Sequence, residues 1–185
     1  AGRPHEVSRL SYQELSRCRV LGKYRIPHLK DMLDFLKSNI GLQCYLDLHR
    51  ASARLAQIIA GAIARESLQG RCFILGFYSK SRDYLLWARS VEPLTRISLM
   101  PEYPWRLLRK AQQVGAKSMC IGWDLKPGHR FLFKSAARFV NLKAQIERAQ
   151  RAGIDVSGGI ANAPEDIAWF IKAGVTGIWS DDLKM

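Results

Sequence analysis

Strand-like and helix-like segments alternate along most of this chain, and the alternation limits the folds that it can adopt. Runs rich in aliphatic and β-branched residues predict strands at about 43–48, 71–77, 95–100, 118–123, 154–158 and 177–181. Between them, apolar residues recur at helical spacing over about 52–68, 81–91, 104–114, 138–152 and 164–173. This order predicts an α/β fold with a parallel sheet and right-handed crossovers.

Two parallel architectures fit this pattern, an open doubly wound sheet and a closed barrel. No GxGxxG follows a predicted strand, which argues against a dinucleotide-binding sheet, and no GxSxG does, which argues against a hydrolase of the α/β type. We therefore expect the (βα)8 TIM-barrel type. A complete barrel has eight strands and typically about 250 residues. With 185 residues and about six predicted strands, this barrel is expected to be partial.

The N-terminal residues precede the first predicted strand and carry helix signals of their own. Ser11 is followed three residues later by Glu14, the spacing of a capping box. Further on, Leu29, Met32, Leu33 and Leu36 stand at helical spacing. A short capped helix and a longer amphipathic one are therefore expected there.

The charge of the chain favours an anionic partner. It holds 29 Lys and Arg against 16 Asp and Glu, which gives +13 and a pI of about 10.0. Such a balance suits polyanions, phosphate-bearing ligands or an anionic membrane surface. The charge is dispersed, however, and runs such as RLLRKAQQ (106–113) and QIERAQR (145–151) have the spacing of solvated helix faces.

The cysteines and the apolar runs predict a cytoplasmic location. Cys18, Cys44, Cys72 and Cys120 show no CxxC spacing, and three of them lie in strand-like runs, as buried thiols do. This usage indicates a reducing compartment and argues against a thiolate metal site. No apolar run approaches the 18 to 20 or so residues of a membrane span, and the N-terminus lacks the apolar region of a signal peptide.

Several segments, in order, resemble one family. They are LSYQEL, YRIPHLKDMLDFL, LQCYLDLH, ILGF and NAPEDIAWFIKAGVTGIWSDD, and together they are similar to the glycerophosphodiester phosphodiesterases. The resemblance implies a single TIM-barrel domain over residues 1–185, N-terminally incomplete. It also implies a metal-dependent hydrolase of lipid metabolism, which converts glycerophosphodiesters to glycerol 3-phosphate and an alcohol with Mg²⁺ or Ca²⁺.

The family's catalytic histidines lie in motifs upstream of everything that this sequence matches. Residues 1–15 look like the stretch that follows a His-Arg-Gly and a His-Asp in the family. We therefore expect no catalytic residue in this chain, no tight metal binding by it alone and no turnover without the missing part.

Two residues of the segment CYLDLHR match functional positions of the family in an altered form. In a strand, Asp47 and His49 share one face and emerge together near its carboxyl end. The resemblance places Asp47 where the family has a metal-binding glutamate and His49 where it has a phosphate-binding lysine. Aspartate is one methylene shorter than glutamate, and histidine replaces a permanent cation by a group that titrates near pH 6.5.

The segment SGGIANAPEDI is a second candidate binding site. Gly158 and Gly159 follow a predicted strand, where backbone N–H groups can approach a phosphate, and Asn162 precedes a helix whose N-terminus is positive. The alternative is a tight βα turn with Asn162 or Ala163 as the N-cap and Pro164 at the first helical position.

Asp124 and Asp181 each end a predicted strand and could line the same barrel mouth. The alternative is that they cap the loop or helix that follows. Trp123 and Trp179 are out of phase with these polar residues and are expected to pack between strand and helix. His129 is expected in a surface loop.

Two other functions stay open. The first is a non-catalytic basic barrel remnant that binds RNA or another polyanionic partner. The second is a phosphate-binding barrel similar to the ribulose-phosphate-binding type, a likeness confined to the last 30 or so residues.

Because two strands of a complete barrel are expected to be missing, the strand at 43–48 is expected to have an open edge. We expect that residues 1–28, a second copy in a homodimer or a partner chain covers it.

Overall fold

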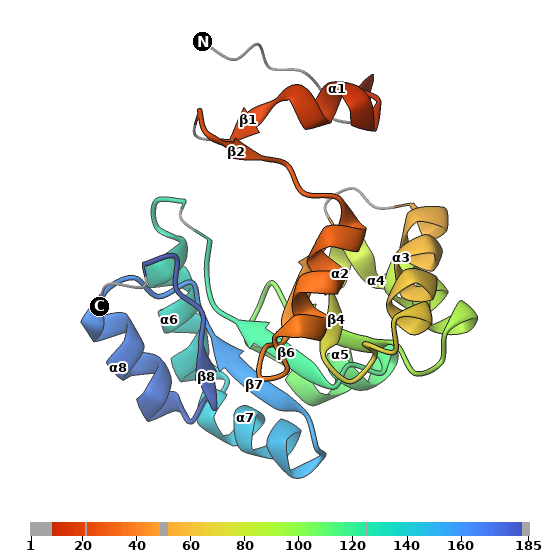
Figure 1. The fold of residues 1–185 in the computed structure, drawn as a ribbon. Helices are drawn as coiled ribbons and strands as arrows, with labels where there is room; N and C mark the ends of the chain where they lie inside the picture. The colour runs from red at the N-terminus through yellow and green to blue at the C-terminus, as the bar shows by residue number, and fades with distance from the viewer. Residues whose placement is uncertain (1–8, 21, 49–51, 125, 183–185) are drawn as a thin grey trace. The chain divides into compact units, whose positions relative to one another are not determined.

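The computed structural model describes residues 9–20, 22–48, 52–124 and 126–182. The chain forms two compact units, residues 1–42 and residues 43–185 (Figure 1). The second unit contains all the predicted barrel strands.

The first unit holds two helices and a small hairpin. Its elements are α1 (Tyr12–Arg17), β1 (Arg19–Val20), β2 (Tyr24–Arg25) and α2 (Leu29–Ser38), with β1 and β2 antiparallel. The predicted capping box is confirmed, because the Glu14 N–H donates to Ser11 Oγ at 3.3 Å and the Ser11 N–H donates to Glu14 Oε2 at 2.8 Å. The amphipathic helix predicted from Leu29 is α2, which His28 caps.

The second unit is built on one parallel sheet. Its strands are β3 (Cys44–Asp47), β4 (Cys72–Phe77), β5 (Arg96–Met100), β6 (Ser118–Ile121), β7 (Asp155–Gly158) and β8 (Gly177–Ile178). They pair in sequence order as a six-stranded sheet, each parallel to the next. The sheet curls into a half-barrel (Figure 1), so the predicted partial TIM-barrel type is confirmed.

Helices connect these strands and cover the sheet. They are α3 (Ala53–Arg65), α4 (Tyr78–Val91), α5 (Leu107–Val114), α6 (His129–Phe139), α7 (Leu142–Arg151) and α8 (Pro164–Ala173). Helix α4 packs against β4, and α7 packs against β7. The core of the unit combines buried strand residues such as Ile74, Ile97 and Met119 with buried helix residues such as Leu85 and Ile146. Burial of these apolar side chains is the main force that holds the helices on the sheet.

The connection between β6 and β7 differs from the prediction. One helix was expected over 138–152, but two helices, α6 and α7, are present. They are separated at Asn141, whose backbone is left-handed (φ 48°) and whose side chain accepts from the Ala144 N–H at 3.3 Å to cap α7. Helix α6 was missed because the stretch that contains His129 was expected to be a surface loop. Two of its large apolar residues, Phe131 and Phe139, are 72% and 91% exposed.

Aromatic side chains join the first and last strands of the sheet. The Tyr45 ring of β3 stacks on Phe73 of β4 with centroids 4.7 Å apart, and it meets the edge of Trp179 at 4.9 Å. Trp123 packs on Phe133 of α6 and on Phe170 of α8, as predicted. Trp179 instead meets strand β3, because β8 ends at Ile178 and strand alternation does not set the direction of the next side chain.

In the described part of the chain, β3 and β8 are the edge strands of the large sheet. The expectation that the edge of β3 is covered by residues 1–28, a second copy or a partner chain stays a prediction. None of the described helices combines the length and the apolar character that a membrane crossing requires.

Candidate functional site

The parallel sheet gathers the predicted site residues at one end. Asp47 is the last residue of β3, Gly158 is the last residue of β7, and Asp124 and Asp181 each follow a strand by three residues. Because all six strands run in the same direction, these positions share the carboxyl edge of the sheet, where (βα)8 enzymes have their active sites.

Asp47 is exposed at this edge, in register with Leu75 of β4. Among the described residues, no group of three or more His, Cys, Asp or Glu side chains could hold a metal ion. Since Mg²⁺ and Ca²⁺ need about six or more oxygen ligands, the described residues alone do not fit the metal site that the family resemblance implies. A role for Asp47 as one ligand among others stays a prediction, and His49 lies outside the described residues.

Gly158 and Gly159 are positions of close packing. A Cβ atom at Gly158 would clash with the Phe170 ring, and one at Gly159 would clash with Trp179. The Gly159 N–H donates to the carbonyl of Ile121 at 3.0 Å, so this donor already has a protein partner. The helix that follows begins at Pro164 with Ala163 as its N-cap. These contacts agree with the tight βα turn, and phosphate binding at the glycines stays a prediction.

Asn162 links the last two strand ends. Its Oδ1 accepts from Ser180 Oγ at 3.0 Å and from the backbone N–H of Asp181 at 2.9 Å. The structure therefore brings Asn162, a predicted phosphate-binding residue, into contact with the backbone of Asp181, a predicted mouth residue. This bond holds the loop after β7 against the segment after β8.

Asp124 bonds within the loop that it begins. Its Oδ1 lies 2.5 Å from His129 Nδ1 and accepts from the Lys126 N–H at 3.2 Å, while Lys126 Nζ lies 3.4 Å from Oδ2. Partial desolvation raises the pKa of the Asp124 carboxyl, but the hydrogen bonds from Lys126 and the nearby charges outweigh it and lower the pKa. His129, predicted in a loop, is the first residue of α6. These contacts agree with the alternative for Asp124, which is to cap the loop that follows, and a place for it at the barrel mouth stays a prediction.

Behind this edge, helices α6 and α8 share a part-buried ion cluster. The Asp166 carboxylate, 9% exposed, accepts from Arg130 Nε at 2.8 Å and from Lys134 Nζ at 2.7 Å. Lys134 Nζ also lies 5.2 and 5.3 Å from the ring centroids of Trp123 and Trp169. With cations and carboxylate matched in this way, the cluster is a structural joint between two helices.

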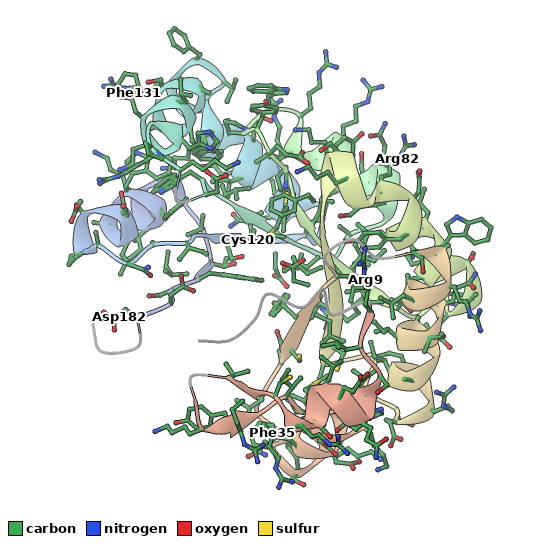
Figure 2. The ribbon with its side chains drawn as sticks, turned by 90° about the horizontal axis from the view of Figure 1, so that it is seen from above. Arg9, Phe35, Arg82, Cys120, Phe131 and Asp182 are labelled. Atoms are coloured by element: carbon green, nitrogen blue, oxygen red, sulfur yellow. The ribbon has the colours of Figure 1, made fainter. Side chains whose placement is uncertain are left out.

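The cysteines do not form a reactive or ligating group. Cys72 and Cys120 are buried, Cys44 is half-buried and Cys18 is exposed, and none of the four forms a disulfide with another described residue. Burial raises the pKa of the Cys72 thiol to about 11 and that of Cys120, inside the sheet (Figure 2), to about 12. Both therefore stay protonated at neutral pH, as expected of structural thiols.

One candidate surface was missed by the sequence analysis. Three exposed arginines, Arg106, Arg109 and Arg148, line a groove between α5 and α7. Two of them begin the run RLLRKAQQ and the third lies in QIERAQR, and both runs were interpreted as solvated helix faces. The signal that could have found them was an aromatic residue, Trp105, beside the first run.

No protein-family model and no curated protein matches the sequence. Among solved structures, the chain is similar to a glycerophosphodiester phosphodiesterase from Parabacteroides distasonis, with 14% identity, a TM-score of 0.68, 92% of this chain covered and 66% of that one. A second enzyme of that type from the same organism has 15% identity, a TM-score of 0.66 and coverages of 95% and 61%. The enzyme from Agrobacterium tumefaciens has 14% identity, a TM-score of 0.54 and coverages of 85% and 59%.

These likenesses show a shared fold. The chain spans less than two thirds of the length of each of these three enzymes, which agrees with a partial domain. The resemblance indicated by the sequence motifs is therefore confirmed: the solved structures that this chain resembles include several glycerophosphodiester phosphodiesterases, and the chain has the fold of part of their barrel.

Proposed function

We propose that this chain forms part of a phosphodiesterase barrel of the glycerophosphodiester type, with the phosphodiester substrate bound at the carboxyl ends of the strands. The observation that carries the proposal is the place of Asp47, exposed at the carboxyl end of the first strand of the half-barrel. A carboxylate at that edge can contribute one ligand to a hard cation such as Mg²⁺ or Ca²⁺.

We also propose that this chain, by itself, does not hydrolyse phosphodiesters. The described residues do not supply a complete set of metal ligands, and Asp124, one of the two acidic residues that follow a strand by three positions, is paired within its own loop. We therefore assign no catalytic step to this chain by itself.

Two measurements on the purified chain test this proposal. Incubation with glycerophosphocholine and millimolar Mg²⁺ or Ca²⁺ is expected to release no glycerol 3-phosphate above a heat-treated control. Calorimetry with either cation is expected to show no saturable heat, because one carboxylate cannot hold a hard cation tightly. A sub-millimolar site that disappears in Asp47→Asn, together with turnover, would show that the chain is a complete catalyst.

A further inference from the structure

The groove between α5 and α7 consists of two adjoining hollows. Their volumes are about 230 and 350 Å³, and they share Arg106, Gln145 and Arg148 in their walls. Arg109 lines the first hollow and Trp105 lines the second. The groove is therefore a continuous concave surface with an arginine-rich part and an aromatic end.

Helix geometry explains why these side chains face outward together. Arg106, Arg109 and Gln112 recur every three residues at the start of and along α5, whereas Leu107, Ala111 and Val114 of the same helix are buried. On α7 the same holds for Gln145 and Arg148, which are three residues apart, against buried Leu142, Ile146 and Ala149. The two helices pack together, so their polar margins form the two walls.

A hydrogen bond holds the walls in place. The Leu107 N–H, at the start of α5, donates to Gln145 Oε1 of α7 at 3.2 Å. The amide nitrogen of Gln145 donates to the carbonyl of Val140 at 3.1 Å. Because both ends of the Gln145 amide are engaged, the two walls of the groove are joined in the absence of a ligand, and such preorganisation lowers the entropic cost of binding.

The positive charge of the groove is not neutralised by the protein. In the described ranges, the side chains of Arg106, Arg109 and Arg148 form no ion pair and no hydrogen bond, and no Asp or Glu lines either hollow. The nearby Glu147 is paired with Arg151 instead, at 3.9 Å. Guanidinium groups bind phosphate oxygens with two parallel donors, so three exposed ones in a groove suit a ligand with several phosphates.

An exposed aromatic pair borders the charged part. The rings of Tyr103 and Trp105 stack on each other with centroids 4.5 Å apart and planes 7° apart, and their residues are 56% and 38% exposed. Lys110 Nζ donates to the Tyr103 carbonyl at 3.2 Å and lies 5.6 Å from the Trp105 ring centroid, which anchors this loop. An exposed flat ring beside unpaired cations suits an unpaired nucleobase, which a duplex does not offer.

We propose that the groove between α5 and α7 binds a single-stranded nucleic acid. Its phosphates contact Arg106, Arg109 and Arg148, and one base stacks on the Tyr103–Trp105 pair. The proposal does not depend on phosphodiesterase activity, because none of these residues belongs to the predicted metal or phosphate positions at the strand ends. It assigns a role to three of the basic side chains in a chain of net charge +13.

Fluorescence anisotropy with a labelled ten-nucleotide oligouridine tests the proposal. Binding is expected at 50 mM salt and is expected to weaken by 200 mM, with a slope of log K against log salt of about −2, since each neutralised phosphate of a single strand contributes about −0.7. The triple variant Arg106→Gln, Arg109→Gln, Arg148→Gln is expected to lose at least tenfold in affinity and most of the slope. Trp105→Ala is expected to lose about tenfold with the slope unchanged.

The matched control removes three other exposed arginines, with Arg54→Gln and Arg65→Gln on α3 and Arg82→Gln on α4. It is expected to bind within about twofold of the unchanged chain. An equal loss in both triple variants would overturn the proposal, because net charge alone would then explain binding. Circular dichroism checks that each variant is folded, and single Arg109→Gln, at an exposed helix position, repeats the test if the triple variant is not.

Competing ligands supply the remaining outcomes. A ten-base-pair duplex that binds as tightly as the single strand would contradict the role given to the aromatic pair. Binding to phosphatidylserine vesicles that is lost in the groove variant, without oligonucleotide binding, would assign the surface to a membrane and overturn the proposal. The deoxyribose form of the same strand is expected to bind with a similar slope, and a tighter ribose form would support RNA as the ligand.

Discussion

Two groups of basic side chains in the same unit have opposite surroundings. Between α6 and α8, Arg130 and Lys134 meet the nearly buried carboxylate of Asp166. Between α5 and α7, Arg106 and Arg148 line a groove without any carboxylate. Both groups lie near aromatic rings, so the kind of side chain alone does not tell them apart. What separates them is the counter-ion. Among the described residues, the fold supplies a carboxylate to the first group and none to the second, so only the second group is left to pair with a ligand.

The difference has a clear electrostatic basis. Asp166 lies in the first turn of α8, where the helix dipole favours a negative charge, and its burial makes both cations necessary. The groove arginines are in water, where an unpaired guanidinium is well solvated and costs the folded state little. The first group is expected to matter for stability and the second for binding.

The largest effect on stability is expected at Phe170, one of the aromatic side chains that pack near Arg130, Lys134 and Asp166. Phe170 is fully buried, stacks on Trp123 with centroids 4.9 Å apart and fills the space beside Gly158. Phe170→Ala is expected to lower the free energy of unfolding by about 3–5 kcal/mol, because it leaves a cavity. The control is Ile171→Ala at the next position, which is 62% exposed and is expected to cost less than about 1 kcal/mol. Urea denaturation of both variants measures this, and equal losses would contradict it.

A smaller loss of stability is expected when the Asp166 carboxylate is neutralised. Asp166→Asn is expected to cost about 2 kcal/mol, below the value for a fully buried pair because the Arg130 side chain is 47% exposed. Glu165→Gln, in the same turn with a 64% exposed side chain, is the control and is expected to cost less than about 0.5 kcal/mol. An unchanged or raised stability in Asp166→Asn would show that the cluster does not hold α6 against α8.

Neutralising the groove is expected to leave stability almost unchanged. Each of Arg106→Gln, Arg109→Gln and Arg148→Gln should shift the free energy of unfolding by less than about 0.5 kcal/mol. The triple variant is expected to gain slightly at low salt, because it reduces repulsion within a chain of net charge +13. Thermal denaturation at low and high salt measures this. A large loss would mean that these arginines have a structural role like that of Arg130.

The smallest effect is expected for Asp124, whose ion pairs with Lys126 and His129 are exposed to solvent. Because contacts with Lys126 and His129 lower the pKa of Asp124, they favour the folded state above the ordinary aspartate pKa of about 3.9. That contribution is lost as the pH falls through the lowered pKa. An NMR titration of the carboxyl carbon is expected to show the low pKa and its return toward the ordinary value in Lys126→Gln. Lys172→Gln on α8 is the control, and an equal shift in it would point to net charge.

Much of the half-barrel could be predicted because its signals are local. Apolar runs predicted all six strands in order, and the capping box of Ser11 and the start of α8 at Pro164 follow from residues within one helical turn. Of the candidate site residues, Asp47 and Asp124 could be placed at strand ends for the same reason. Their contacts could not be predicted, since Asp124 meets His129 only because α6 begins there.

The sequence by itself determined the order of strands and helices, since each depends on the periodicity of neighbouring residues. Tertiary structure decided which charges are paired. Arg130 and Asp166 are 36 residues apart, and Leu107 and Gln145, which join the walls of the groove, are 38 apart. In the sequence, RLLRKAQQ and QIERAQR each resemble a solvated helix face. Only the packing of α5 on α7 puts their arginines in one groove, because side chains far apart in the chain become neighbours through burial of the apolar faces between them.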